Sequence, residues 1–471
     1  MKIETSKLIL LLKALGSDEF KQLNDFVRSP FHNKNTKVIQ LLEALHGHYP
    51  KFSSEQLTRE ALHARIFVDR PFNDLDIRRS MSQLALVVES FLGWSNMMQR
   101  PTELRVAQLR AFRKKGLQKH FVKSAKEATL MLETQQQSLH QHYQQFCILQ
   151  ERESFEEQFG GRRSETRLQQ VSDHLDTFYM ASKLKQSCAV VSYEQVFKHR
   201  YHIDLTTEVL QLLENKTVES PLVNLYRFGL LTMSEPENES HFINLKKLLQ
   251  NSPDMEPSEE RNIHVLGQNY CIRNMNRGRS EYINELFELY KLGLEKQVIQ
   301  SDLSQFPPAF KNIVSTGLKV KQFDWVEKFI HNYSDLIPKA DRSDFRNFNL
   351  SRLRFDQGRF IEVKQLLQEV RFKDVFITLN ARILLIKTFY ELDEWDVLEH
   401  QIKSFKGFIS RQKKLSYHAN IFMDNVRFIS KLVRLNHNKK ADVEKLTAEV
   451  NGEKTLTEKS WILSKLTEVI W

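Results

Sequence analysis

The C-terminal third of the chain contains an internal repeat. An aromatic residue recurs at Phe323, Phe360 and Trp395, at intervals of 37 and 35 residues. Apolar residues lie ten positions before each aromatic residue and three, seven and ten positions after it: Ile313, Val326, Ile330 and Tyr333, then Leu350, Val363, Leu367 and Val370, then Leu385, Leu398, Ile402 and Phe405. This period predicts stacked helical hairpins, because one antiparallel helix pair cannot bury its apolar face alone. We place the aromatic residues at the turns between paired helices. Trp395 is expected to be buried there, so its replacement by Ala would cost about 3 to 5 kcal/mol.

The composition extends this prediction to the whole chain. Only 14 of the 471 residues are Gly and 11 are Pro, while residues that favour helices are abundant. The chain also exceeds the roughly 250 to 300 residues at which single cores stop growing. We therefore expect an all-α protein made of stacked antiparallel helical hairpins, an α-solenoid, preceded by an N-terminal helical module.

Proline and glycine positions divide the chain into four predicted regions. Pro101 and Pro221 mark two of the boundaries, since proline commonly opens a new helix. The regions are an N-terminal helical module (1–100), a middle region of long helices (101–220), the helical repeats (221–436) and C-terminal capping helices (437–471).

Capping residues locate several individual helices. Ser17 is expected to cap a helix that ends before Pro30, and Asn35 to cap the following one. The stretch 117–159 has no proline, and its glutamines at 135–137 interrupt the apolar periodicity. We predict a break between Thr134 and Ser138, because average helices are far shorter than this stretch.

Cysteine usage and hydropathy indicate the compartment. Cys147, Cys188 and Cys271 are odd in number and far apart, so they predict neither a disulfide framework nor a zinc site. The apolar run 8–12 is shorter than a signal-peptide core, and no segment approaches the roughly 20 apolar residues of a membrane span. We expect a cytoplasmic protein that does not associate with membranes.

The net charge of +10 is concentrated in two basic stretches. Residues 105–126 contain eight Lys and Arg and no acidic residue, and residues 403–440 contain ten with the single acid Asp424. Such stretches attract phosphates or an acidic partner, but lysine-rich exposed helices are also ordinary solubilising surfaces, and we favour that interpretation. The candidate basic surface in the first stretch comprises Arg110, Arg113, Lys114, Lys115, Lys119 and Lys123.

The usual signatures of catalysis and cofactor binding do not occur in the sequence. It lacks the phosphate-binding patterns GxGxxG and GxxxxGK and the metal-binding patterns HExxH and CxxC. His140 and Cys147 could share one helix face, but a surface histidine above a buried cysteine is the simpler interpretation. Glu153 and Glu157 lie among polar residues and indicate a solvated face. We therefore predict no enzymatic activity and no cofactor.

The repeat resembles the tetratricopeptide-repeat family over about residues 220–436. Pro338 lies fifteen residues after Phe323, where that family usually has its proline. Val326, Val363 and Leu398 depart from the family, which generally has alanine there. The N-terminal stretch 29–35, with the sequence SPFHNKN, resembles segments of uncharacterised bacterial proteins.

The family resemblance implies a binding groove lined by the first helix of each hairpin. These helices correspond to Pro308–Lys321, Ser343–Gln357 and Val375–Leu392. The polar residues that the resemblance places in the groove are Lys319, Asn349, Arg352 and Lys387. The predicted function is a non-catalytic scaffold or adaptor that binds a protein or peptide in this groove. The alternative is a nucleic-acid-associated helical-repeat protein that uses the basic stretches 105–126 and 403–440. The sequence predicts no particular oligomeric state.

Overall fold

The computed structural model places ten stretches of the chain, and their regular structure is entirely helical. They are residues 3–53, 57–68, 70–160, 167–197, 199–216, 218–368, 374–411, 417–435, 440–453 and 455–468. These stretches form 23 α-helices and two short 3-10 helices, which confirms the all-α prediction. The chain divides into two compact units, Met1–Tyr179 and Met180–Trp471, and each is described by itself. The four regions drawn from the sequence stay predictions.

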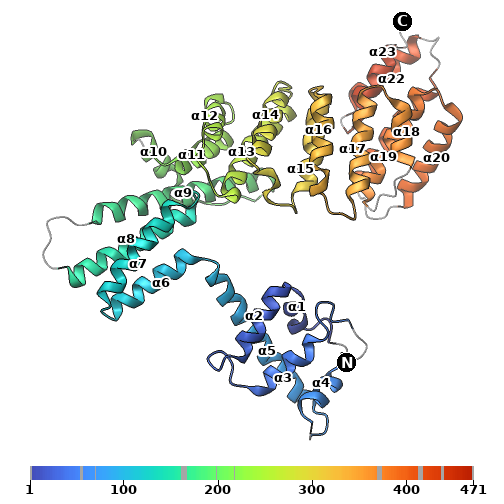
Figure 1. Cartoon of the computed structure of the whole chain (residues 1–471). Helices are drawn as coiled ribbons and strands as arrows, with labels where there is room; N and C mark the ends of the chain where they lie inside the picture. Colours follow the sequence, from blue (N-terminus) through green and yellow to red (C-terminus); the bar gives the residue numbers. More distant parts are fainter. Residues whose placement is uncertain are drawn as a thin grey trace. The chain divides into compact units, whose positions relative to one another are not determined.

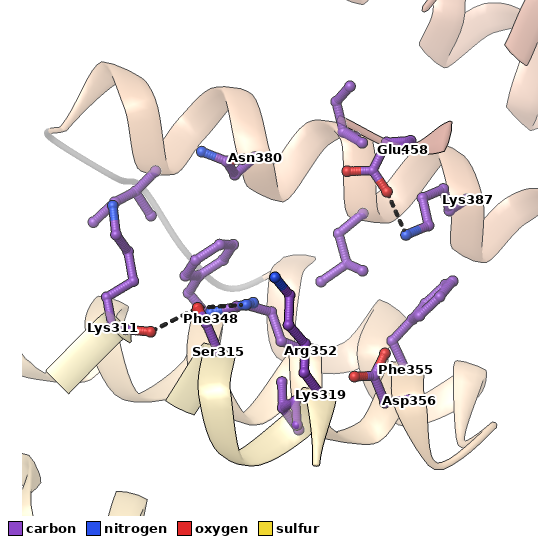
Figure 2. A pocket seen from close by; sticks show the side chains of 14 residues that line it. Lys311, Ser315, Lys319, Phe348, Arg352, Phe355, Asp356, Asn380, Lys387 and Glu458 are labelled. Atoms are coloured by element: carbon purple, nitrogen blue, oxygen red, sulfur yellow. Dashed lines mark hydrogen bonds and ion pairs between the residues drawn. The ribbon is translucent and has the colours of Figure 1, made fainter. Parts of the chain in front are cut away.

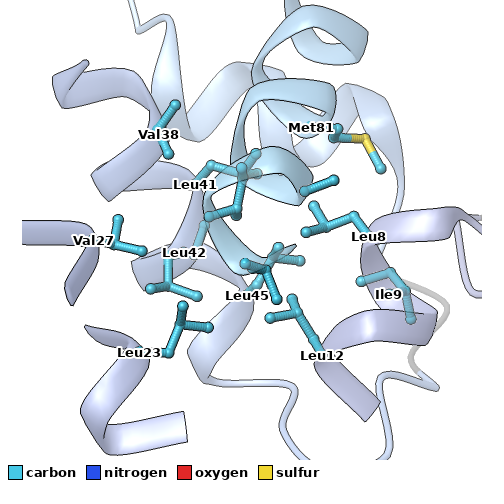
Figure 3. Close-up of a cluster of buried hydrophobic side chains, with 14 of the residues drawn as sticks. Leu8, Ile9, Leu12, Leu23, Val27, Val38, Leu41, Leu42, Leu45 and Met81 are labelled. Carbon is cyan, nitrogen blue, oxygen red and sulfur yellow. The ribbon is translucent and has the colours of Figure 1, made fainter. Parts of the chain in front are cut away.

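Unit 1 begins with five helices around one apolar core. They are α1 (Lys7–Lys13), α2 (Ser17–Arg28), α3 (Thr36–His46), α4 (Arg59–Ile66) and α5 (Asp74–Met98). The long helix α5 contacts the other four. Figure 3 shows the leucines that face the core centre, among them Leu8, Leu12, Leu41 and Leu45, all of which are almost fully buried.

Side-chain caps fix where most of these helices begin. The Asn35 side chain accepts a hydrogen bond from the Lys37 amide at 2.9 Å, as predicted. The predicted cap at Ser17 is wrong by one residue, because Ser17 is already helical and Gly16 is the cap. The Glu19 carboxylate accepts a hydrogen bond from the Gly16 amide at 2.8 Å, which is the bond that the N3 side chain contributes to a capping box.

Three further helices and part of a fourth complete unit 1. They are α6 (Pro101–Lys114), α7 (Gln118–Glu133), α8 (Leu139–Phe159) and the first part of α9 (Leu168–Val196). The predicted break between α7 and α8 is confirmed, with Thr134 as the C-cap of α7 and Ser138 as the N-cap of α8. A small apolar cluster that includes Leu109, Phe121 and Ile148 holds α6, α7 and α8 together.

Unit 2 is an array of consecutive helical hairpins (Figure 1). The first part of the array contains α10 (Thr206–Asn215), α11 (Pro221–Ser234), α12 (Glu239–Gln250), α13 (Pro257–Asn276) and α14 (Tyr282–Glu295). The second contains α15 (Phe306–Lys319), α16 (Phe323–Tyr333), α17 (Arg342–Asp356), α18 (Phe360–Gln368), α19 (Val375–Glu391) and α20 (Trp395–Arg411). The 3-10 helices Ile299–Ser301 and Ser334–Leu336 lie in connections. Each helix from α11 to α20 contacts the next, and α15, α17 and α19 also contact one another in that order.

Three helices follow the array at the C-terminal end. They are α21 (Tyr417–Val433), α22 (Lys440–Gly452) and α23 (Lys459–Glu468). They share one apolar core with α19 and α20. None of the helices that the structure describes in either unit is long and apolar enough to cross a membrane.

The repeat positions explain how the hairpins pack. The three recurrent aromatic residues are the first residues of α16, α18 and α20, directly after a hairpin turn. Val326, Val363 and Leu398 are completely buried, whereas the repeat position Val370 lies outside the described residues. The expected burial of Trp395 is wrong, because 43% of its surface is exposed. Its ring meets the Tyr390 ring edge-on, with 5.3 Å between the ring centroids.

Candidate functional site

A pocket of about 360 Å³ lies where α15, α17 and α19 run beside one another. Each helix contributes residues from one face, at spacings of three and four. Figure 2 shows these side chains: Lys311, Ser315 and Lys319 from α15, Phe348, Arg352, Phe355 and Asp356 from α17, and Asn380 and Lys387 from α19. Glu458, from the segment before α23, completes the wall. We call this pocket the array groove.

Two cationic side chains of the array groove are exposed. Lys311 and Lys319 lie two turns apart on α15, and neither forms an ion pair with another described residue. Because these ammonium groups remain hydrated and mobile, they are available to an incoming anion at little cost in desolvation.

The other two cationic side chains are held in place. Arg352 Nη2 donates to Ser315 Oγ at 2.9 Å, and Ser315 Oγ donates to the Lys311 carbonyl at 2.7 Å. Burial of Arg352 disfavours its charged form and lowers its pKa. Lys387 Nζ lies 2.7 Å from a Glu458 carboxylate oxygen, and it faces the Phe355 ring with 4.5 Å to the centroid. A guanidinium and an ammonium therefore stand at fixed positions over an aromatic surface.

The carboxylates of the array groove leave positive charge in excess. Glu458 is paired with Lys387, while Asp356 lines the same pocket and is exposed. Partial desolvation raises the Asp356 pKa, and the nearby Lys387 and Arg352 oppose this effect. Four basic side chains thus share the pocket with two acidic ones, so an anionic ligand is favoured over a cationic one.

The structure gathers three of the four groove residues expected from the sequence. Lys319, Arg352 and Lys387 all line the array groove. The placement of Asn349 is wrong, because this residue is completely buried and its amide donates to the Phe345 carbonyl at 2.8 Å. The groove-facing residues of α17 include Phe348 and Arg352, and a residue next to Phe348 is rotated by about 100° around the helix.

Sequence reasoning missed two residues that shape the array groove. Lys311 precedes Lys319 by eight residues, so helical spacing on the same face could have identified it. Glu458 had no such signal, because it follows Lys387 by 71 residues and reaches the groove only through the packing of the C-terminal helices.

The basic stretch 105–126 contains cations that a buried carboxylate binds and cations that it does not bind. Arg110 and Arg113 both bind the buried carboxylate of Glu151, at 3.0 and 2.9 Å. They therefore stabilise the packing of α6 against α8. Arg110 is exposed as well as paired, whereas Lys114, Lys115, Lys119 and Lys123 are exposed and form no ion pair with a described residue.

The second basic stretch is partly neutralised by acidic neighbours. Arg427 pairs with Asp424 at 3.0 Å, and Lys431 forms an ion pair with Glu449. Residues 412–416 and 436–439 of this stretch lie outside the described part of the chain. Throughout the residues that the structure places, no group of three or more His, Cys, Asp or Glu side chains could hold a metal ion.

Comparison of the chain with protein-family models, with curated proteins and with solved structures finds no match. The all-helical array is compatible with a helical-repeat fold. The geometry and charge of the site are therefore the basis for a functional proposal.

Proposed function

We propose that the protein is a non-catalytic interaction scaffold whose array groove binds an extended peptide segment with acidic side chains. The observation that carries this proposal is the alignment of α15, α17 and α19, whose matching faces form one pocket with four basic and two acidic residues. Helical-repeat arrays provide such extended concave surfaces because each hairpin contacts only its neighbours.

The proposed ligand chemistry follows from the residues of the array groove. Lys311 and Lys319 would attract carboxylates, and Arg352 would orient one of them from a fixed position. The half-buried Ile377, which also lines the pocket, offers contact to apolar parts of the same peptide, because the Phe348 and Phe355 rings are themselves buried. The ion pair between Lys387 and Glu458 is an internal example of the contact expected with a peptide carboxylate.

The likeness of the repeat to tetratricopeptide arrays supports the same proposal. In that family the first helix of each hairpin lines the groove, and α15, α17 and α19 hold that position here. We propose the cytoplasm as the compartment, because the three cysteines are far apart in the sequence.

Selection from a random peptide library displayed on phage, with the full chain as bait, tests this function. We expect the selected peptides to be enriched in Asp and Glu. Their affinity should fall at least tenfold in the variant Lys311→Gln/Lys319→Gln, because two unpaired cations of the groove are lost.

A charge-matched variant separates groove binding from general attraction to a basic protein. Lys328→Gln/Lys339→Gln removes two exposed cations that do not line the array groove. This control should bind the selected peptides as the wild type does. An equal loss in both variants, or a selection without acidic enrichment, would contradict the proposal.

A further inference from the structure

Unit 1 contains a second basic pocket, formed by α7 and α8. Its volume is about 820 Å³. Lys119, Lys123 and Lys126 lie along one side of it on α7, at intervals of four and three residues, and so extend over about 10 Å of helix. Arg152 on α8 and Arg167, just before α9, add two guanidinium groups. We call this pocket the α7–α8 pocket.

The positive charge of the α7–α8 pocket is poorly compensated. Glu156 is the single carboxylate among the residues that line it, and it already forms an ion pair with Arg167. Lys119, Lys123 and Lys126 are exposed and form no ion pair with another described residue. Mutual repulsion among these lysines is relieved when an anion binds.

Arg152 strengthens this argument because it is half-buried. Its guanidinium also forms no ion pair within the described residues, and its one direct polar contact there is with Thr129 Oγ1 at 3.4 Å. Burial lowers the Arg152 pKa and the nearby Arg167 lowers it further, while the Glu156 carboxylate partly opposes both effects. Glu156 is shared between Arg152 and Arg167, so a bound anion would further stabilise this partly desolvated cation.

Aromatic rings form the apolar part of the α7–α8 pocket. Phe121 and Phe155 are stacked, with centroids 4.0 Å apart and planes at 3°. Phe155 also contacts Phe159 at 5.1 Å between centroids. Phe121 is buried, whereas Phe155 and Phe159 keep part of their surface accessible next to the cations.

We infer that the α7–α8 pocket binds a short stretch of single-stranded nucleic acid. The lysines of α7 contact the phosphates, and a base packs on the accessible surface of Phe155 and Phe159. A row of cations beside aromatic rings is the combination by which proteins hold single strands, since every base offers a ring face. An acidic peptide would use the cations but would gain less from the rings. This inference does not depend on the function proposed for the array groove.

Fluorescence anisotropy, which measures the affinity of the full chain for a labelled oligothymidylate of about 20 nucleotides, tests the inference. The variant Lys119→Gln/Lys123→Gln should bind more than about tenfold more weakly at 0.1 M salt. Its slope of log affinity against log salt should be shallower by about 1.4, since each lost phosphate contact removes about 0.7.

The matched control is Lys114→Gln/Lys115→Gln, which removes the same charge from the same basic stretch outside the pocket. We expect binding within about twofold of the wild type. Circular dichroism confirms that both variants are folded. An equal loss of affinity in both variants, or no binding by the wild type, would overturn the inference.

The variant Phe159→Leu tests whether a base is recognised together with the phosphates. Oligothymidylate binding should weaken at least about fivefold, because base stacking on an aromatic ring is lost. Inorganic polyphosphate should compete equally well against both proteins.

Oligonucleotides should also compete better than ATP at equal nucleotide concentration. An unchanged affinity in Phe159→Leu, or equal competition by ATP, would overturn the assignment to a nucleic-acid strand. An acidic peptide that displaces the oligonucleotide with equal potency would do the same.

Discussion

The array groove and the α7–α8 pocket are both basic, but they hold their cations in different ways. In the array groove, Lys387 is paired with Glu458, and Arg352 is hydrogen-bonded to Ser315. In the α7–α8 pocket, three lysines of one helix are exposed and form no ion pair with a described residue. Two of the four cations of the array groove are thus fixed in place before any ligand binds, whereas the three lysines of α7 are exposed to solvent.

This difference shows that acidic neighbours determine whether a basic side chain takes part in packing or stays available for binding. Residues 105–126 look uniformly basic in the sequence, yet Glu151 binds Arg110 and Arg113 and makes them part of the packing. The lysines that follow have no such partner among the residues that the structure describes, and they remain at the surface. A count of basic residues along the chain therefore overstates the cationic surface that is available for binding.

The largest expected effect tests the division between structural and exposed cations in unit 1. The variant Arg110→Met/Arg113→Met leaves the buried Glu151 without a counter-charge, which should reduce stability by about 3 kcal/mol. Hydrogen exchange of the α8 amides measures this loss locally.

Two further variants complete that test. Adding Glu151→Leu to Arg110→Met/Arg113→Met should restore most of the stability, because no buried charge then remains unpaired. Lys114→Met/Lys115→Met should change stability by less than about 0.5 kcal/mol. If Arg110→Met/Arg113→Met were as stable as Lys114→Met/Lys115→Met, Arg110 and Arg113 would not contribute to the packing of α6 against α8.

The second prediction concerns His264, a buried histidine of the array whose protonated form is disfavoured. His264 is 1% exposed, and burial together with the nearby Lys296 lowers its pKa from 6.5 to about 4. The unfolded chain therefore binds a proton at a higher pH than the folded chain does. The stability that this histidine contributes is present above pH 6.5 and is lost as the pH falls toward 4.

The expected size is about 2 kcal/mol between pH 7 and pH 5. Urea unfolding followed by tryptophan fluorescence measures it, since Trp325, Trp395 and Trp461 lie in unit 2. The variant His264→Leu should lose about 2 kcal/mol less than the wild type over this pH range. An identical acid loss in both proteins would show that His264 is not the group that titrates.

Much of the array could be predicted from the sequence because its signals are local. The recurrent aromatic residues are the first residues of α16, α18 and α20. The predicted bounds of α15, α17 and α19 are correct to within two residues. Helix periodicity determines such features over a few turns. The exposure of Trp395 was not predictable in this way, because it depends on which side of the ring the neighbouring hairpin covers.

The candidate sites were less predictable because they combine distant segments. Lys319, Arg352 and Lys387 were expected in the array groove, but Asn349 lies on another face of α17. Arg152 and Arg167 join the basic stretch only when α8 packs on α7. No local pattern contains that information, since it depends on tertiary packing.

The third prediction compares Lys387, which is paired in the array groove, with Lys319, which is exposed there. Lys387→Met should reduce stability by about 1.5 kcal/mol, because the variant loses the ion pair with Glu458 and the contacts with the Phe355 and Trp461 rings. Lys319→Met should have almost no effect. Tryptophan fluorescence during urea unfolding provides the measurement, and equal stability of the two variants would remove the distinction.

The smallest expected effect has the opposite sign. Lys119, Lys123 and Lys126 repel one another when the α7–α8 pocket is empty, so Lys119→Met/Lys123→Met should raise stability by about 0.5 kcal/mol at low salt. The gain should disappear near 1 M salt, where the Debye length is about 3 Å. Hydrogen exchange of the α7 amides at both salt concentrations detects it. A loss of stability instead would mean that these lysines contribute to the packing of α7, as Arg110 and Arg113 do for α6. In that case the contrast between the two basic pockets would not hold.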